Sequence, residues 1–402
     1  MDRRAFLRVG TAASAAGAGL LAGCSGLFSV QTGYQERMPP LPENRPAAVY
    51  YPSHIEGMEM VGMKTVGGND SGSTGTTNGT ASDGAKSDGT SRSNDSGGDS
   101  GTAGGYRCAL TYSYPHRFWT VTGTETEKVS IGDNDSLHLM VSVWDPATGV
   151  FPMDTNPTIT ISQNGDSVTT VSPWTMLSQN MGFHTGDNIS LPGAGDYTVT
   201  VDVPPTSVRR TGSFDGRFDS QQSVEFSFTF DPDKVSDIMF KELDEKAGTR
   251  GAVEPMEMKK MPLALAPKKG ELPGRPLGTV RTGDAVFAVR TLSDASRFGG
   301  DEKTYLAVSA RTPHNRYVLP AMSLSATVAR GNETVFDGAL QATLDPALNY
   351  HYGASVESIE SGDEIDIVVD APPQVARHEG YETSFLKMPS RTLTVGDGSG
   401  GQ

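Results

Sequence analysis

Basic residues are a minority in this chain, because 33 Lys and Arg stand against 48 Asp and Glu and give a net charge of -15. Proteins that bind nucleic acid gather Lys and Arg against the phosphates, so this balance argues against a nucleic acid partner. Familiar catalytic motifs are also missing, since the chain has no Gly-x-Ser-x-Gly elbow, no phosphate-binding loop and no His-Glu-x-x-His helix. We therefore expect a protein that is not an enzyme.

Cysteine is almost absent, and the two in the chain are Cys24 and Cys108. Cys24 ends a Leu-Ala-Gly-Cys sequence that resembles a lipoprotein signal-peptidase site, and it follows the Arg3-Arg4 pair and a short apolar run. We interpret residues 1–24 as a twin-arginine lipoprotein signal peptide. The mature chain would be exported and anchored by a lipid on Cys24 at the extracytoplasmic face of the cell membrane. No intrachain disulfide is then available, and Cys108 is expected to be a buried apolar residue.

Long apolar runs are missing as well. The apolar stretch before Cys24 is shorter than the ~20 residues that a membrane-spanning helix needs, and no later stretch is long enough. An uncleaved N-terminal anchoring helix is the alternative to a signal peptide. In both cases we expect contact with the membrane through the N-terminal end.

Helical periodicity is rare, whereas the alternation of half-buried strands is frequent. Only residues 233–247 have helical spacing, with Gly248 as a stop. The clearest alternating runs are residues 137–144, 197–203, 224–230 and 364–369. Short strands bounded by Gly, Pro, Asn and Asp predict an all-β fold of two tandem immunoglobulin-like β-sandwich domains.

The division into two domains follows from an internal repeat. Residues 56–63 read Glu-Gly-Met-Glu-Met-Val-Gly-Met, and residues 254–261 read Glu-Pro-Met-Glu-Met-Lys-Lys-Met. Each copy is followed by a methionine after Pro or Ala, by a His-x-Gly tripeptide and by a Pro-Pro pair. The tripeptide histidines, His184 and His351, are 167 positions apart, but the opening segments are 198 apart. The first domain therefore contains an insertion.

The insertion corresponds to residues 66–105, which are almost all Gly, Ser, Thr, Asp or Asn. This composition cannot bury enough apolar surface to fold, so we interpret the segment as a disordered loop inside the first domain. The other boundaries follow from composition and strand pattern. They are a tether at 25–45, domain one at 46–232, a helical linker at 233–251, domain two at 252–395 and a disordered tail at 396–402.

Histidine, methionine and glutamate recur at matching places in the two domains. A mixture of imidazole, thioether and carboxylate suits copper, or divalent iron, zinc or manganese, better than magnesium or calcium. Core packing is the simpler reading of the methionines, because methionine at the start of a sandwich strand commonly fills the interior. The residues of domain two that combine these groups are Met256, Glu257, Met258, Met322, His351 and His378.

The order of these motifs resembles the iron-transport-associated periplasmic metal-binding proteins, whose members accompany high-affinity iron permeases. The resemblance implies a copper or iron site on an immunoglobulin-like sandwich. It further implies a lipid-anchored protein that assists iron uptake beside a permease or another envelope protein. In domain two it implies His351 and His378 as imidazole ligands, Met322 as a thioether ligand and Glu257 as a carboxylate ligand, with Met256 or Met258 lining the site.

Domain one departs from this pattern. Arg210 stands five residues beyond its Pro-Pro pair, where domain two has His378, and a guanidinium cannot ligate a metal. Domain one therefore lacks a ligand unless another histidine, His54, His116 or His138, replaces it. Its weaker candidates are Met58, Glu59, Met153 and His184. The aromatic segment 112–119 is either a site peculiar to domain one or a rim of exposed aromatics.

A different class of function fits the same outline, namely a non-catalytic surface module of two β-sandwich domains that contacts other envelope proteins. The two hypotheses differ in geometry. Metal binding requires His351, His378 and Met322 to converge on one ion, at about 2.0 to 2.4 Å. Scattered side chains would favour the interaction module.

Overall fold

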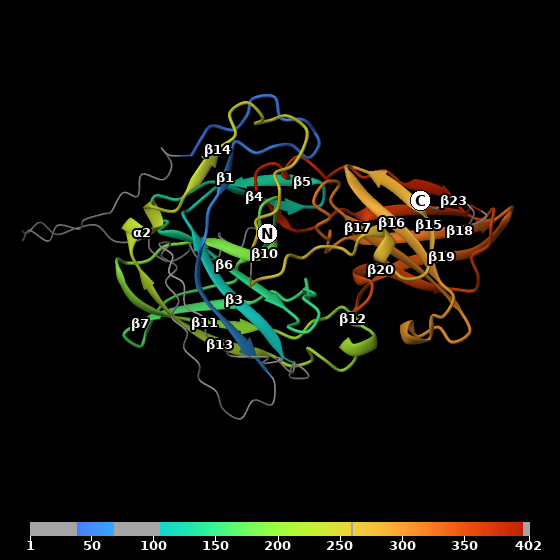
Figure 1. Ribbon diagram of the computed structural model, residues 1–402, viewed down its shortest axis with the longest axis horizontal. Coiled ribbons are helices and arrows are strands. Elements are labelled where there is room, and N and C mark those ends of the chain that lie inside the picture. Colours follow the sequence, from blue (N-terminus) through green and yellow to red (C-terminus); the bar gives the residue numbers. More distant parts are fainter. Residues whose placement is uncertain (1–37, 68–104, 259, 397–402) are drawn as a thin grey trace, which may run out of the picture. The chain divides into compact units, whose positions relative to one another are not determined.

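The fold is known from a computed structural model that describes residues 38–67, 105–258 and 260–396. The interpretations of the signal peptide, most of the tether, nearly all of the Gly/Ser loop and the C-terminal tail lie outside the described residues. Strands make up most of the described regular structure (Figure 1), which confirms the predicted all-β class with sandwich domains. The domain boundaries stay predictions, and all described residues belong to one compact unit.

Domain one packs an eight-stranded sheet against a four-stranded one. The larger sheet, in spatial order, consists of β2 (Glu59–Val66), β3 (Tyr106–Ser113), β6 (Leu137–Trp144), β10 (Gly182–Ile189), β9 (Trp174–Ser178), β22 (Ala376–Arg377), β4 (Phe118–Thr122) and β5 (Glu125–Val129). The smaller sheet consists of β13 (Gln222–Phe230), β11 (Gly195–Val203), β7 (Thr158–Gln163) and β8 (Asp166–Val171). The Gly/Ser loop connects β2 to its antiparallel partner β3, so the insertion extends one hairpin.

Domain two forms a single folded-over sheet whose strands lie together in Figure 1, coloured orange to red. Its strands, in spatial order, are β15 (Arg275–Thr282), β16 (Ala285–Leu292), β17 (Thr304–Arg311), β20 (Asn349–Val356), β19 (Glu333–Asp345), β18 (Ser323–Arg330), β21 (Glu364–Ala371) and β23 (Arg391–Thr394). The long strand β19 pairs with β18 over residues 333–340 and with β20 over residues 341–345. One strand therefore joins both layers of this sandwich.

The two domains exchange equivalent short strands. β12 (Arg209–Arg210) follows the Pro-Pro pair of domain one and pairs in parallel with β19 of domain two. β22 follows the Pro-Pro pair of domain two and pairs in parallel with β9 of domain one. Each domain thus adds a short strand to its partner's sheet, so the exchange is reciprocal.

This exchange corrects the equivalence between Arg210 and His378. Arg210 lies opposite Leu344 and Arg377 lies opposite Leu177 in matching parallel pairs, so Arg210 is the counterpart of Arg377. The N–H of Thr211 donates to Leu344, as the N–H of His378 donates to Leu177. His378 therefore corresponds to Thr211. Counting from the prolines was misleading because the loop before β12 is one residue longer than the loop before β22.

The predicted helix over 233–247 is wrong in its extent. The helix α2 spans Pro232–Ser236, with the Asp231 side chain accepting from the Asp233 N–H as an N-cap. The chain then forms β14 (Phe240–Glu242), which pairs with β1 (His54–Glu56). The pairing with β1 provides hydrogen bonds for backbone groups that would otherwise bond within a longer helix. Tertiary contact therefore overrides the helical propensity of this segment. The other helices in the described ranges are short 3-10 turns, η2 (Gly212–Phe214), η3 (Lys269–Glu271) and η4 (Ser296–Phe298).

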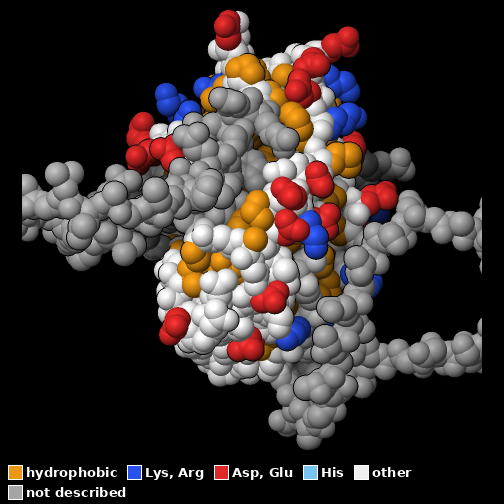
Figure 2. Space-filling model, turned by 90° about the vertical axis from the view of Figure 1, so that its left-hand side faces the viewer, with side chains coloured by type: hydrophobic (Ala, Val, Ile, Leu, Met, Phe, Trp, Pro, Cys, Tyr) orange, Lys and Arg blue, Asp and Glu red, His pale blue; other side chains and the backbone are white. Residues whose placement is uncertain are grey.

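The surface is predominantly polar. On the face that Figure 2 displays, acidic side chains are spread among basic, neutral and apolar ones. Among the described residues, the exposed large hydrophobic side chains are Met60 and Met239. No helix in the described ranges is both long and apolar enough to cross a bilayer.

Candidate metal centre

Strand β6 is buried on both faces, although its alternation predicted that one face meets solvent. Leu139, Val141 and Val143 belong to the hydrophobic core. Because side chains alternate along a strand, His138 and Met140 point to the opposite face. That face is also covered, since His138 is 0% and Met140 1% exposed. The covering groups come from β1, from the loop between β3 and β4, and from the segment that follows β22.

Three buried histidines meet on this covered face. Ring nitrogens of His116, His138 and His378 all lie within 4.8 Å of one another. The ring of His116 lies 3.9 Å from that of His138 and 4.7 Å from that of His378, measured between centroids. Nitrogen ligands lie ~2.1 Å from a zinc ion, so a small inward movement would let the three rings share one ion.

Two more histidines and a carboxylate border the three. The His184 ring lies 5.1 Å from the His378 ring. Glu56 places Oε2 3.4 Å from Nδ1 of His378, and Oε1 3.6 Å from Nε2 of His54 and 3.9 Å from Nδ1 of His116. The spacing of His54 and Glu56 puts both on one face of β1. The arrangement combines imidazole rings with one carboxylate.

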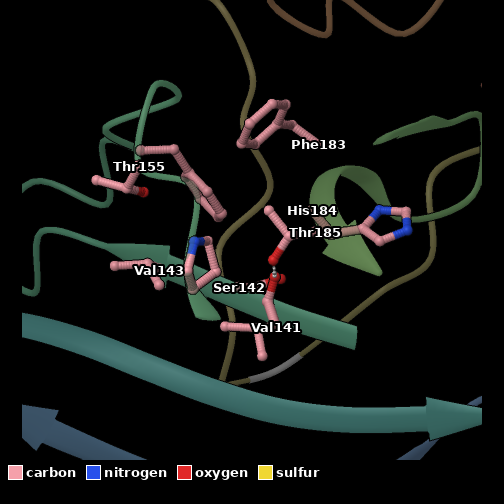
Figure 3. A pocket seen from close by; sticks show the side chains of 9 residues that line it. Val141, Ser142, Val143, Thr155, Phe183, His184 and Thr185 are labelled. Carbon is pink, nitrogen blue, oxygen red and sulfur yellow. Dashed lines mark hydrogen bonds between the residues drawn. The ribbon is translucent and has the colours of Figure 1, made fainter. Parts of the chain in front are cut away.

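Side chains alternate between the two faces of β10, so His184 and its neighbour Thr185 point in opposite directions. Thr185 donates its hydroxyl to the carbonyl of Val141 at 3.1 Å. Figure 3 shows the imidazole of His184 extending away from the side chains of Val141, Val143 and Thr155. The cavity that these residues line measures about 10 Å³, room for roughly one water. The face of β10 that carries the His184 ring is therefore the one that can contribute to a binding site.

Hydrogen bonds hold the imidazole rings with one nitrogen free. Nδ1 of His138 lies 2.9 Å from Oδ1 of Asn188, while Nδ1 of His116 and of His184 lie 3.2 Å from backbone carbonyl oxygens. The Asn188 amide nitrogen donates to the carbonyl of His116 at 2.9 Å, which leaves its oxygen facing His138. Carbonyl oxygens only accept, so each Nδ1 carries the hydrogen and each Nε2 keeps a lone pair.

These lone pairs accept no hydrogen bond from the described part of the chain. Nε2 of His116, His138 and His184 and both ring nitrogens of His378 are buried without a hydrogen-bond partner there. Leaving a buried polar atom unpaired costs ~1–3 kcal/mol, and four such rings together call for an explanation. A bound metal ion provides one, because it would accept one lone pair from each of the four rings. The side chains present therefore fit a metal ion.

Burial also favours the neutral imidazole form. It lowers the pKa of His116 to about 4 and the pKa of His184 to about 3, and it holds the pKa of His138 well below the ordinary value. Burial opposes ionisation of Glu56, but the neighbouring His116, His378 and His54 outweigh it and keep the Glu56 pKa well below its ordinary value. Neutral imidazole and ionised carboxylate are the forms that bind metals.

Gly186 provides the space for His138. A Cβ atom on Gly186 would lie 2.6 Å from Nε2 of His138, too close for any real contact. The His-x-Gly tripeptide of domain one thus combines His184 with an opening for a ring from the neighbouring strand. Gly353 has the same relation to the Tyr305 hydroxyl in domain two.

Two thioethers flank the histidines in domain one. Met140 shares a strand face with His138, and Met176 lies directly opposite His184 in the pairing of β9 with β10. Both methionines are buried, at 1% and 0% exposure. Their counterparts 167 positions later are Ala307 and Thr343. The thioethers therefore accompany the copy of the repeat that contains the histidine cluster.

The equivalent positions of domain two carry different side chains. Tyr305 replaces His138, Thr211 replaces His378, and Phe298 takes the place of His116. The Phe298 ring stacks on Tyr305 at 3.7 Å between centroids, where the His116 ring lies tilted against His138 at 3.9 Å. His351 corresponds to His184, but its Nε2 lies 3.0 Å from the Tyr305 hydroxyl and its Nδ1 lies 3.0 Å from a backbone carbonyl. Both of its nitrogens are thus engaged.

The grouping of the expected site residues differs from the prediction. His378 joins the cluster, and His184 lies beside it, whereas His351 lies in the domain-two pocket with Tyr305. The other candidates are placed as follows: Met153 and Met322 in the hydrophobic core, Met58 and Met258 half-buried against it, Met256 half-buried, and Glu59 and Glu257 exposed. His378 therefore lies in a cluster on the sheet of domain one, apart from His351, because strand exchange carries it across.

The sequence offers His54, His116 and His138 as possible replacement ligands in domain one, but no motif in it points to Glu56. The Met-Glu repeat indicates Glu59 as the candidate carboxylate instead, but Glu59 is exposed on β2. The available signal was the spacing of His54 and Glu56, two residues apart, which places both side chains on one face of a strand.

Part of the chain is similar to known proteins. A family model for a domain of unknown function, DUF7350, matches residues 270–394, most of domain two. No curated protein matches the chain. Among solved structures the chain is similar to FetP of uropathogenic E. coli strain F11, crystallised after recombinant expression in the E. coli periplasm. The identity is 20%, the match covers 31% of this chain and 87% of that one, and the TM-score is 0.25. A TM-score this low supports no conclusion about this chain.

Proposed function

We propose that the protein binds a transition metal ion in the histidine cluster of domain one. The supporting observation is the convergence of His116, His138 and His378, each of which has a ring nitrogen within 4.8 Å of the others and a buried Nε2 without a hydrogen-bond partner among the described residues. His184 and Glu56 supply further donors at the border. Imidazole and carboxylate suit divalent copper, iron, zinc and manganese. The flanking Met140 and Met176 favour copper among these, because thioethers are soft ligands.

The proposal assigns the protein to metal carriage and not to catalysis. It is exported, anchored through a lipid on Cys24, and assists the uptake of iron, or of copper linked to iron uptake, beside a permease or another envelope protein. The motif order and the signal-like N-terminus support this part of the proposal. The buried position of the cluster also suits carriage, because an enclosed ion is protected from solvent and from competing ligands.

Metal titration tests the proposal. Calorimetry with Cu²⁺, Fe²⁺, Zn²⁺ and Mn²⁺ is expected to show tight binding of at least one ion to the purified protein. His116→Gln, His138→Gln and His378→Gln should each abolish tight binding, because each removes a ligand from a shared ion. His351→Gln is the matched control, since it changes the buried counterpart of His184 outside the cluster. Binding that ignores the cluster variants would overturn the metal hypothesis and leave the surface interaction module as the better account.

A further inference from the structure

A second buried group of polar side chains adjoins the histidine cluster. Ser53, His54 and Glu379 are 4%, 4% and 7% exposed. Oε1 of Glu379 accepts from the Ser53 N–H at 2.7 Å, and Oε2 accepts from the Ser53 hydroxyl at 3.0 Å and from Nη2 of Arg117 at 2.6 Å. The Ser53 hydroxyl oxygen also lies 2.8 Å from Nδ1 of His54 and 3.1 Å from Nη2 of Arg117. Glu379 belongs to domain two, whereas its partners belong to domain one.

The hydrogens available to this group determine the tautomer of His54. A serine hydroxyl has one hydrogen to donate and accepts two. Because the Glu379 carboxylate only accepts, the Ser53 hydrogen points to it. Arg117 only donates, so it fills one acceptor position of Ser53. His54 must then donate from Nδ1 to the remaining position, which leaves the lone pair on its Nε2.

That Nε2 faces Glu56, the carboxylate that borders the histidine cluster. It lies 3.6 Å from Oε1 of Glu56 and has no hydrogen-bond partner within the described ranges. Glu56 in turn contacts His116 and His378, members of the cluster. Glu56 therefore links His54 to the cluster, and an ion bound by both Glu56 and the cluster would lie beside Nε2 of His54.

We infer that Glu379 is a positioning residue for the metal centre: acting through Ser53, it fixes His54 as the Nδ1–H tautomer and so presents Nε2 as an additional ligand. This inference rests on the proposed metal binding. It also means that docking of domain two contributes twice to the site, once through His378 and once through the adjacent carboxylate. Partners that orient ligating histidines through their other nitrogen typically change metal affinity ~10- to 100-fold when they are mutated.

Glu379→Gln separates this role from simple packing. A glutamine of the same shape can accept from the Ser53 N–H with its oxygen and donate to the Ser53 hydroxyl with its nitrogen. Arg117 then loses its bond to the replaced carboxylate oxygen, because both groups only donate, and keeps its bond to the Ser53 hydroxyl. The Ser53 hydroxyl then receives hydrogens from Gln and Arg117, and its own hydrogen turns to Nδ1 of His54. The variant is therefore expected to invert His54 to the Nε2–H tautomer, which cannot ligate through Nε2.

The experiment reads the tautomer of His54 in metal-free full-length protein by ¹⁵N NMR of the imidazole nitrogens, and then titrates the same samples with Zn²⁺. Glu379→Gln should move the hydrogen from Nδ1 to Nε2 and weaken Zn²⁺ binding ~10- to 100-fold. Glu382→Gln is the matched control, because Glu382 is a buried carboxylate of the same segment that binds Tyr50 and Arg45 but not Ser53. The control should retain the Nδ1–H tautomer and the affinity.

Ser53→Ala keeps the test decisive if Glu379→Gln fails to fold. It removes the link to His54 but retains the ion pair of Glu379 with Arg117 at 2.6 Å and the Ser53 backbone bond. It should also weaken Zn²⁺ binding and release the His54 tautomer. Unchanged tautomer and affinity in both variants would overturn this inference alone, provided that His116→Gln still abolishes binding. If His116→Gln binds Zn²⁺ normally, the proposed function itself fails.

Discussion

At the residue scale, Gly186 makes room for the cluster because it has no Cβ atom. A Cβ at this position would lie 2.6 Å from Nε2 of His138, the atom expected to bind the ion. We expect Gly186→Ala to displace the His138 ring and to weaken metal binding by ~10-fold or more, because ligand geometry must hold within ~0.5 Å. Calorimetric titration measures the change. Gly193→Ala is the control, since its Cβ would meet nothing within 4 Å. Equal losses in both variants would contradict this explanation.

His351 is expected to make stability depend on pH. Burial lowers its pKa to about 4, from an ordinary value of 6.5. The unfolded chain therefore takes up the proton at a higher pH than the folded one. The contribution of His351 to the unfolding free energy is fully present above pH 6.5 and is lost as the pH falls toward 4. His351→Gln removes this contribution. In metal-free protein, the loss of unfolding free energy between about pH 7.5 and about pH 5 should be smaller by ~2 kcal/mol.

Urea denaturation at the two pH values measures this difference. His314→Gln is the control, because His314 is exposed. If the His351 variant keeps the acid sensitivity of the unaltered protein, the assigned role of His351 is wrong.

At the element scale, β22 depends on a buried arginine. Arg377 is 0% exposed, and its guanidinium donates to the backbone carbonyls of Ser384, Tyr381 and Pro373. These hydrogen bonds hold the segment that contains His378 in a compact loop. Arg377→Ala leaves these buried acceptors unpaired, at ~1–3 kcal/mol each when no water replaces the donor. We expect a loss of ~2–4 kcal/mol in unfolding free energy together with weaker metal binding.

Thermal and urea unfolding of metal-free protein, followed by titration, checks both effects. Arg210→Ala is the matched control, because Arg210 is the counterpart of Arg377 but is half-buried and pairs with Asp219. It should cost less stability and leave metal binding intact. Normal metal affinity in a folded Arg377 variant would show that the loop does not position His378.

At the scale of the whole molecule, strand exchange makes the chain resemble a dimer with unequal halves. The cluster exists in the half that contains His138 and receives His378, while the other half has Tyr305 and Thr211 at these places. We therefore expect one tightly bound ion per chain. The ion should also stabilise the fold, by ~2.7 kcal/mol when the free metal concentration is ~100 times the Kd. Elemental analysis gives the ratio, and thermal unfolding with and without chelator gives the stabilisation.

The variant His378→Gln should lose both the bound ion and the stabilisation by metal. Two ions per chain, with the second dependent on His351, would contradict the assignment and restore the domain-two site that the sequence predicted.

The alternation of apolar and polar residues along the sequence was sufficient to predict many of the strands. The alternating runs 137–144, 197–203, 224–230 and 364–369 fall within strands β6, β11, β13 and β21, because a period of two depends only on neighbouring residues. The burial of Cys108 was also predicted and is confirmed. The repeat indicated two related halves, and histidine content with methionine and carboxylate indicated a metal as the ligand class.

Tertiary structure alone decided where the cluster forms. The helix predicted over 233–247 yields to pairing between β14 and β1, which also carries Glu56 toward the histidines. The residues that meet, from Glu56 to His378, are separated by more than 300 positions. Sequence spacing contains no information about which distant strands pair, because that choice depends on the summed packing of both sheets. The sequence alone therefore determined the strands and the ligand types, and the exchange of strands between the two halves determined which ligands meet.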